Sequence, residues 1–418
     1  KTRSISGKAT YTAERIGAGP LVLDQVALDF SAISIGGTPV QWRVVGDTVE
    51  ILVSEEMARG ESVDIVIEYK ATPEKGLHFR EVGGGSPDAY GEVWSQGQKQ
   101  DNRFWFPTWD HPNERFDYTG QVRAPAGWKT YTNTGNEMPA YLVMLAAGTY
   151  KVVGESNNQV WVGPGVSDVA VRAALGPVPG IVEHFEERSG VKYPWNGLRQ
   201  FFVQRFLYGG MENTSAIINT DSVLSSAKIS ETRTRLPSLM AHEIAHQWYG
   251  DLLTCRSWRD LWLNEGFATF MEGDWLASRD GPDRWADKVL GWNRSSRRER
   301  AMAGRFHQGP NAPSNHNVYS KGATVLQMLR VMLGEDVFWA GMRHYTQGHQ
   351  RALVQTVDLQ RSMEHVSGQE LGWFFQQWVE LPHVPHLKVS QKYADGRLEV
   401  RVVQTERKKR PLYTLPID

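Results

Sequence analysis

The chain has 418 residues, of which 40% are hydrophobic and 22% are charged, a composition typical of globular proteins that excludes a disordered chain. Its 46 Lys and Arg residues nearly balance its 47 Asp and Glu residues, which argues against a nucleic-acid-binding protein with a strongly basic surface. Cys255 is the only cysteine, so an intramolecular disulfide is excluded, and no apolar stretch approaches the ~20 residues that a membrane-spanning helix needs.

Residues 1–153 have the pattern of a β-sheet domain. VDIVIEYK at 63–70 alternates apolar and polar side chains, and LVLDQVALDF at 21–30 shows a similar alternation with interruptions. Gly and Pro recur between such segments, as in GGTP at 36–39 and EVGGGSP at 81–87. Alternation interrupted by turn residues predicts antiparallel strands with one buried face.

Residues 154–383 have a mainly helical pattern. A helical stretch ends before Tyr193, and FFVQRF at 201–206 predicts a short strand that enters a glycine-rich turn. Residues 236–379 are mostly helical in pattern, with charged stretches that are typical of solvated helix faces or loops. This part of the chain is therefore predicted to be a second, helical domain.

After Pro382 the β pattern returns. Three segments carry it, namely HLKVSQKYAD, GRLEVRVVQTE and RPLYTLPID, and three strands are too few for an independent sandwich. The sequence therefore predicts an α+β multidomain fold, with an N-terminal antiparallel β-sheet domain at 1–153, a mainly helical domain at 154–383 and a short β segment at 384–418.

The sharpest chemical signal is SLMAHEIAHQWYGDLL at 238–253. On a helix, His242 and His246 lie one turn apart on the same face, where both imidazoles can reach one tetrahedral zinc ion. Glu243 stands beside the first ligand, where its carboxylate can take a proton from a metal-activated water. A His-Glu-x-x-His match alone is weak evidence, because an amphipathic helix with two surface histidines has the same pattern.

A second helical segment, LWLNEGFATFMEGDWLAS at 261–278, carries a third candidate ligand. The 18 residues at 247–264 leave room for a loop and a returning helix, so Glu265 can meet the two histidines. Two His and one Glu with an open fourth position form a catalytic zinc set. Glu272 lies two turns further along the same face, where it either accepts a hydrogen bond from a ligand histidine or forms a surface salt bridge.

YGGMENTSAI at 208–217, together with HEIAHQWYGD and WLNEGFA, resembles the zinc aminopeptidases of the aminopeptidase N family, gluzincins that include the leukotriene epoxide hydrolase. Segments at 95–116, 316–329 and 373–379 also resemble that family, so the resemblance covers essentially the whole chain. It implies a saddle-like β-sheet domain, a thermolysin-like catalytic domain and a short C-terminal β segment. The sequence lacks a counterpart of the bigger relatives' C-terminal helical domain, and the stretch at 133–138 is shorter than theirs, so a shortened form is expected.

The resemblance implies the catalytic roles. One zinc ion per chain would be held by His242, His246 and Glu265. Glu243 would be the general base of a zinc-dependent metallo-aminopeptidase. Tyr319 would stabilise the tetrahedral intermediate, since a phenol aimed at the developing oxyanion is a hydrogen-bond donor.

The resemblance also implies how a substrate is bound. Glu212 would bind the free amino group of a peptide, and Gln98 would be the second contact with that group. Gly209 and Gly210 would offer backbone groups to the peptide, and Met211 would border the first side-chain pocket. A carboxylate that faces an ammonium ion forms a charge-assisted hydrogen bond and sets the distance to the scissile carbonyl.

Three other functions remain to be weighed. An epoxide hydrolase is suggested by SQGQ at 95–98, and a non-catalytic scaffold is a further class, although the ligands, base and tyrosine are all present. A thermolysin-like endopeptidase is disfavoured by Gly210-Met211-Glu212-Asn213, because this motif makes sense only if it binds the free amine of a substrate. The expected partners are peptides with a free N-terminus. A cytoplasmic location is favoured, with a secreted or periplasmic one open because the first residue is not Met.

Overall fold

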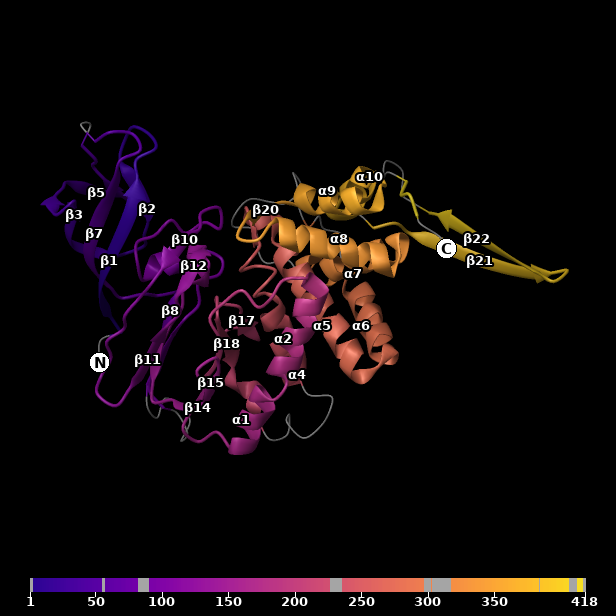
Figure 1. Cartoon of the computed structure of the whole chain (residues 1–418), viewed down its shortest axis with the longest axis horizontal. Helices are drawn as coiled ribbons and strands as arrows, with labels where there is room; N and C mark the ends of the chain where they lie inside the picture. Colours follow the sequence, from indigo (N-terminus) through magenta and orange to yellow (C-terminus); the bar gives the residue numbers. More distant parts are fainter. Residues whose placement is uncertain are drawn as a thin grey trace. The chain divides into compact units, whose positions relative to one another are not determined.

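The structure is a computed structural model that describes residues 3–54, 57–81, 90–225, 235–296, 302, 317–382, 384–405 and 412–415. Antiparallel sheets come first in the chain and helices dominate after them (Figure 1), which confirms the predicted α+β fold class. The chain divides into two compact units, with residues 1–183 and 193–254 in unit 1 and residues 184–192 and 255–418 in unit 2. The division predicted at 153 and 383 stays a prediction.

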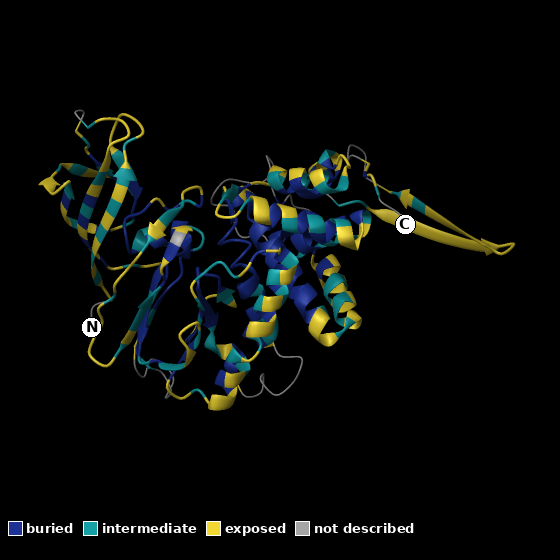
Figure 2. Cartoon of the chain, viewed as in Figure 1, coloured by how far each residue is buried: buried dark blue, intermediate teal, exposed yellow. Residues whose placement is uncertain are grey.

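Unit 1 begins with two antiparallel sheets that share one apolar core. Their strand orders are β1-β7-β3-β4 and β2-β6-β5. The strands are β1 (Ile5–Glu14), β2 (Leu21–Asp24), β3 (Asp29–Ile35), β4 (Thr38–Pro39), β5 (Trp42–Val45), β6 (Thr48–Ile51) and β7 (Ser62–Ala71). Along β7, Ile65 and Ile67 are buried while Asp64 and Glu68 are exposed (Figure 2), and the two isoleucines join Val49 of β6 in the core. The alternation predicted at 63–70 therefore forms a half-buried strand.

The interrupted alternation at 21–30 belongs to two strands of different sheets. β2 ends at Asp24 and β3 begins at Asp29. Between them Ala27 has a φ of 55°, and the backbone N–H of Leu28 donates to the side-chain oxygen of Gln25 at 3.1 Å. A positive φ and a local side-chain hydrogen bond are turn features, so the interruption marks a change of sheet.

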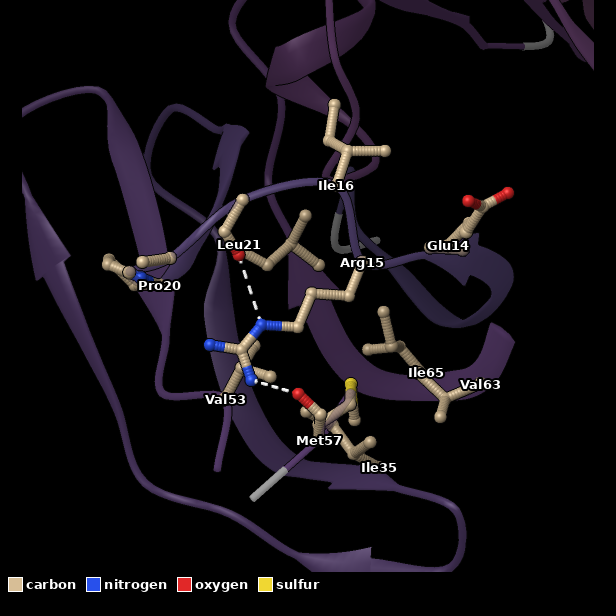
Figure 3. Close-up of a pocket in the computed structure, with 14 residues that line it drawn as sticks. Glu14, Arg15, Ile16, Pro20, Leu21, Ile35, Val53, Met57, Val63 and Ile65 are labelled. Carbon is tan, nitrogen blue, oxygen red and sulfur yellow. Dashed lines mark hydrogen bonds between the residues drawn. The ribbon is translucent and has the colours of Figure 1, made fainter. Parts of the chain in front are cut away.

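An apolar pocket lies beside this core, where β1 leads into β2 (Figure 3). The guanidinium of Arg15 lies among its lining residues and donates to three main-chain carbonyls, those of Gly17 at 3.0 Å, Ser54 at 2.6 Å and Met57 at 2.6 Å. Because its donors serve main-chain carbonyls, Arg15 anchors the chain segments around the pocket.

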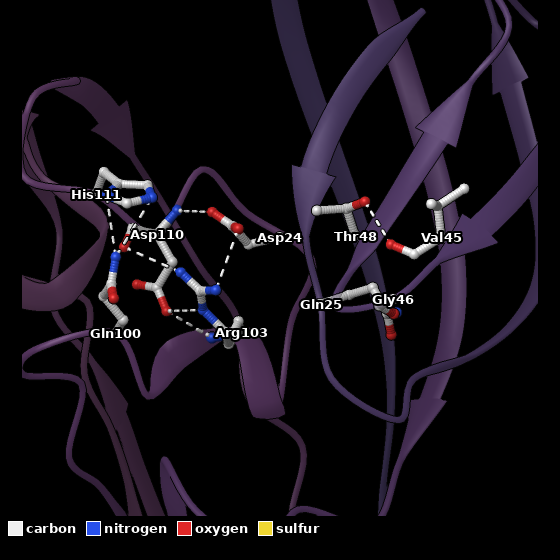
Figure 4. A network of polar contacts seen from close by, with 9 residues as sticks. All are labelled: Asp24, Gln25, Val45, Gly46, Thr48, Gln100, Arg103, Asp110 and His111. Carbon is white, nitrogen blue, oxygen red and sulfur yellow. Dashed lines mark hydrogen bonds and ion pairs between the residues drawn. The ribbon is translucent and has the colours of Figure 1, made fainter. Parts of the chain in front are cut away.

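A buried ion-pair network connects β2 to the segment after η1 (Asn102–Phe104). Arg103 lies between two carboxylates, with Nη1 at 3.2 Å from Asp24 Oδ1 and Nε at 3.2 Å from Asp110 Oδ2 (Figure 4). The backbone N–H of Asp110 donates to Asp24 Oδ2 at 2.9 Å. Burial raises the pKa of Asp110 to about 7, although hydrogen bonds from Arg103 act in the opposite direction. We call Asp24, Arg103 and Asp110 the Arg103 network.

Two further sheets complete the first part of unit 1. One has the order β11-β13-β9-β8, and in the other β10 pairs with β12. The strands are β8 (Leu77–Arg80), β9 (Glu92–Ser95), β10 (Phe116–Tyr118), β11 (Lys129–Thr132), β12 (Gly135–Met138) and β13 (Leu145–Gly148). On β9 the carboxylate of Glu92 is fully buried, where it accepts hydrogen bonds from the backbone of Gln204 at 2.7 Å and from the hydroxyl of Tyr150 at 3.1 Å.

A mixed five-stranded sheet follows, with the order β14-β15-β16-β18-β17. Its strands are β14 (Lys151–Glu155), β15 (Asn158–Val162), β16 (Leu198–Val203), β17 (Gly210–Met211) and β18 (Ala216–Thr220), and α1 (Asp168–Leu175) and α2 (Val178–Ser189) lie between β15 and β16 in the sequence. The strand predicted at 201–206 ends at Val203, because the chain turns at Arg205, whose φ is 54°. β17 is an edge strand antiparallel to β18, and α4 (Arg235–Ala245) contacts it.

Unit 2 is mainly helical, as predicted. Its helices are α5 (Trp262–Asp280), α6 (Pro282–Ser295), α7 (Asn317–Leu333), α8 (Glu335–Gly348), α9 (Thr356–Ser367), α10 (Gly372–Phe375) and a π-helical turn, Gln376–Glu380. α5 and α7 cross backbone to backbone, since a Cβ on Gly266 would lie 2.8 Å from the Cα of Gly322. In the described residues no helix has the length and apolar character needed to cross a membrane.

The end of the chain differs from the prediction of three strands. β21 (Leu387–Ala394) and β22 (Arg397–Gln404) form a hairpin, but the described residues 412–415 lie in no strand. Side-chain amides take their backbone groups instead. Gln404 bonds both the N–H and the carbonyl of Tyr413, and Gln377 does the same for Thr414. The third predicted strand is therefore wrong for these residues.

Candidate metal and amine site

The two predicted histidine ligands lie at the end of α4. His242 is within the helix, which ends at Ala245, and His246 is in the turn that follows. The backbone N–H of His246 still donates to the carbonyl of His242 at 3.3 Å. This near-helical geometry brings the two Nε2 atoms to 3.2 Å from each other, so the predicted pairing on one face is present although the second histidine lies beyond the helix.

This pair of nitrogens fits a zinc ion. Two ligand atoms ~2.0–2.1 Å from a tetrahedral zinc are ~3.3 Å apart, close to the distance between the Nε2 atoms of His242 and His246. Nδ1 of His246 lies 2.9 Å from the carbonyl of Tyr249, so this nitrogen donates a proton. In the neutral ring the lone pair is then on Nε2, the atom that faces His242.

Two carboxylates stand beside the histidines in unit 1. Ligand atoms of Glu212, Glu243 and His246 all lie within 4.8 Å of one another, and the three residues are buried. Unit 1 therefore contains a candidate metal-binding group of His and Glu residues. Gly210 makes room for this arrangement, because a Cβ there would lie 2.4 Å from Glu243 Oε1.

The predicted substrate-binding residues of unit 1 are also brought together. The side-chain amide of Gln98 donates to Glu212 Oε1 at 3.4 Å, although 113 residues separate the two in the chain, at 99–211. Gly209 leads into β17, its carbonyl accepting from the N–H of Thr220 at 2.9 Å. Gly210 and Met211 form β17, so the backbone proposed to bind peptide belongs to an edge strand.

The remaining predicted residues belong to unit 2. Glu265 is buried in the first turn of α5, and Tyr319 is half-buried in the first turn of α7. Glu272, further along α5, forms an ion pair with Lys288 of α6, which is the salt-bridge alternative considered above. The roles predicted for these three residues stay predictions.

The structure adds two charged residues that the sequence did not single out. Asp251 is fully buried, and its pKa is raised well above the usual range, first by burial and then by the negative charge of Glu212. Arg115 donates to the main-chain carbonyl of Asp251 at 2.8 Å. Glu212 and Glu243 both act electrostatically on Asp251, so three carboxyl groups lie close together here, which favours a positively charged ligand.

Gln247 is a further residue that sequence reasoning missed. Its side-chain amide donates to the carbonyl of Glu212 at 2.9 Å and accepts from the N–H of Ser215 at 2.8 Å. Its place directly after His246 in HEIAHQWYGD was a weak signal, since a glutamine beside a ligand is ordinary. Only the folded chain shows that this amide reaches the Glu212 segment.

Comparisons with known proteins find similar sequences among peptidases. A family model described as the peptidase family M1 domain matches residues 173–378. Aminopeptidase N of Streptomyces lividans is 26% identical over an alignment that covers 93% of this chain and 50% of that protein. Tricorn protease-interacting factor F2 of Thermoplasma acidophilum is 25% identical, with 93% of this chain and 53% of that protein covered.

Solved structures show the same fold. Yeast LTA4 hydrolase in complex with bestatin superposes with a TM-score of 0.80 at 20% identity, covering 92% of this chain and 66% of that chain. The chain spans about half the length of the first curated relatives it matches. The matched segment contains every histidine and glutamate of the proposed site, namely Glu212, His242, Glu243, His246, Glu265 and Glu272. The resemblance seen in the sequence is confirmed, since residues 173–378 match the peptidase family M1 domain and the relatives found include aminopeptidases.

Proposed function

We propose that the protein is a zinc-dependent aminopeptidase that hydrolyses the first bond of peptides with a free N-terminus. The position of Glu212 carries this proposal, because its carboxylate lies within 4.8 Å of ligand atoms of both Glu243 and His246. In a peptide the N-terminal nitrogen and the first carbonyl carbon are only ~2.5 Å apart. A carboxylate that holds the ammonium so near the proposed base favours attack at the first bond.

Zinc would be held by His242, His246 and Glu265, and would supply a Lewis acid that polarises a carbonyl and lowers the pKa of a water. The spacing of the two Nε2 atoms and the tautomer of His246 support the histidine ligands. The third ligand is supported by the 18-residue spacing and by the match of residues 173–378 to the peptidase family M1 domain.

The chain's own residues would then perform the proton transfers and the binding. Glu243 accepts the proton of the attacking water and returns it to the leaving amine. Tyr319 donates a hydrogen bond to the developing oxyanion. Glu212 accepts from the substrate's ammonium, and Gln98 can accept another of its protons through the side-chain carbonyl.

The test is a pair of peptides that differ only in N-acetylation. Acetylation removes the charge that Glu212 binds, and loss of one partner of a buried charged pair costs ~3–5 kcal/mol, or about 10²–10⁴ in kcat/KM. The free peptide should be cleaved and its acetylated twin should be almost inert. Glu212→Gln should reduce cleavage of the free peptide and bind zinc as the wild type does, measured by elemental analysis.

Two controls make the result specific. Treatment with a chelator should abolish cleavage, and added zinc should restore it. Equal cleavage of the two peptides would identify an endopeptidase and contradict the proposal. Zinc binding without cleavage of any peptide would favour a non-catalytic scaffold.

A further inference from the structure

The backbone directly after Glu212 makes a strained turn. Ser215 has a φ of 61°, and the N–H of Ala216 donates to the carbonyl of Asn213 at 2.8 Å. Positive φ at the third position of such a turn suits glycine, whereas a serine there costs free energy. Something outside the turn must therefore stabilise this conformation.

One side chain bonds the main chain just before the strained turn and within it. Gln247, fully buried, donates from Nε2 to the carbonyl of Glu212 at 2.9 Å and accepts at Oε1 from the N–H of Ser215 at 2.8 Å. A planar amide offers a donor and an acceptor at fixed separation, so both bonds can form only when residues 212–215 keep this path.

Gln247 is itself held in place by hydrogen bonds from two other side chains. The indole N–H of Trp195 donates to the main-chain carbonyl of Gln247 at 3.0 Å, and the hydroxyl of Tyr193 donates to Oε1 at 3.3 Å. A side chain fixed at both its backbone and its tip has little freedom to follow a moving partner. Gln247, just after the end of α4, therefore holds the Glu212 segment in place, and its own position does not depend on that segment.

We propose that Gln247 is a positioning residue that fixes the distance between the metal site and the amine-binding carboxylate. It follows His246 directly in the chain, so one short segment supplies a proposed metal ligand and the anchor for Glu212. The inference rests on the proposed function, and it names the residue that positions Glu212, the carboxylate proposed to restrict cleavage to the first bond. Gln247 acts through Glu212, without touching the substrate.

The first test removes the amide with Gln247→Leu. This change leaves the Glu212 carbonyl and the Ser215 N–H without these bonds, and such a loss corresponds to about tenfold to hundredfold. KM for a free-amine peptide should rise by that factor while kcat changes less, and zinc content should stay at the wild-type level. The preference for the free peptide over its N-acetylated twin should fall by a similar factor.

Gln200→Leu is the matched control. Gln200 is also fully buried in unit 1, and its amide donates to the carbonyl of Ala174 at 3.1 Å. The Gln200→Leu variant therefore removes a buried amide without affecting the Glu212 turn. A purely structural role of Gln247 predicts that the two variants change thermal stability and leave the preference for a free amine alone. Equal changes of preference in both variants would overturn the proposal.

A rescue separates the turn from other effects of the leucine. Glycine adopts positive φ without strain, so Ser215→Gly should restore part of the lost KM in the Gln247→Leu background. In the wild-type background it should change KM little. If the double variant is as impaired as Gln247→Leu alone, the strained turn is not what the amide stabilises.

Amide hydrogen exchange gives a readout that does not depend on turnover. In Gln247→Leu, a peptic fragment covering residues 209–218 should exchange faster than in the wild type, and in Gln200→Leu it should not. If the wild type cleaves no peptide but this difference appears, the proposed function fails and the positioning contact stands. Unchanged exchange in Gln247→Leu overturns the inference even if the enzyme is an aminopeptidase.

Discussion

Two of the regions in which unit 1 buries charged groups treat those groups differently. In the Arg103 network one guanidinium lies between two carboxylates, each at 3.2 Å. In the candidate site three carboxyl groups are gathered, and the nearby Arg115 donates to the main-chain carbonyl of Asp251. Carboxylates that each contact the same guanidinium hold two parts of a fold together, whereas carboxyl groups clustered beside one another prepare a site for a positively charged ligand. This difference separates a structural region from a functional one.

The largest effect should come from the proposed base. Glu243→Gln keeps the shape of the site but cannot accept a proton, so kcat should fall by about 10²–10⁴. Zinc content, measured by elemental analysis, should be unchanged because the histidines are intact. His246→Ala is the control that should lose zinc and activity together. Turnover of Glu243→Gln within a few-fold of the wild type would assign the proton transfer to another group.

The Arg103 network should show the opposite behaviour, with a loss of stability and not of chemistry. Arg103→Leu leaves the carboxylates of Asp24 and Asp110 without their cation, which should lower the free energy of unfolding by ~3–5 kcal/mol. Urea unfolding measures this change, and zinc binding by the folded variant should persist. Arg43→Leu removes an ion pair with Glu50 whose arginine side chain is 69% exposed, so it should cost less than ~1 kcal/mol. Equal losses of unfolding free energy in Arg103→Leu and Arg43→Leu would show that the Arg103 network is no more stabilising than an exposed ion pair.

A smaller effect should appear in the pH dependence of stability. Burial raises the pKa of Glu92 to about 7, against opposing hydrogen bonds from Gln204 and Tyr150. Between pH ~4.5 and ~7 the folded state keeps a proton that the unfolded state has lost, so this group lowers stability as pH rises, by at most ~1.4 kcal/mol per unit.

Glu92→Gln should therefore flatten the dependence of the unfolding free energy on pH across that window. Asp110, whose pKa is raised to the same value, should account for part of the remaining slope. Glu68→Gln, on the exposed face of β7, is the control and should leave the slope as it is. An unchanged slope in Glu92→Gln would show that Glu92 is ionised in the folded protein over this range.

Local patterns were enough to predict much of the fold. The alternation at 63–70 becomes β7, and the helical pattern after residue 236 becomes α4 and the helices of unit 2. The prediction was wrong where other groups competed for the backbone. Residues 412–415 lie in a segment with a β pattern, but side-chain amides of Gln377 and Gln404 form the hydrogen bonds that a third strand would need. Such competition depends on residues that are distant in the chain.

The site was predictable to the extent that its chemistry is local. His242, Glu243 and His246 are recognisable because their roles follow from a spacing of four residues. Gln98 could be assigned through the resemblance alone, and its hydrogen bond to Glu212 needs the folded chain. Asp251 and Gln247 escaped notice because their importance comes from burial and from bonds to a distant turn, neither of which a single sequence displays.

The crossing of α5 and α7 fixes the distance between these two helices. Gly266 follows Glu265 directly, and Gly322 lies one helical turn after Tyr319. At their contact the two backbones meet with no side chain between them, so the spacing of the helices is set by main-chain atoms, which have no rotamers to exchange. Glu265, the proposed third ligand, and Tyr319, the proposed oxyanion donor, therefore lie on two helices whose separation is fixed. Substitutions elsewhere in the core can change how side chains pack without changing the distance between these two helices.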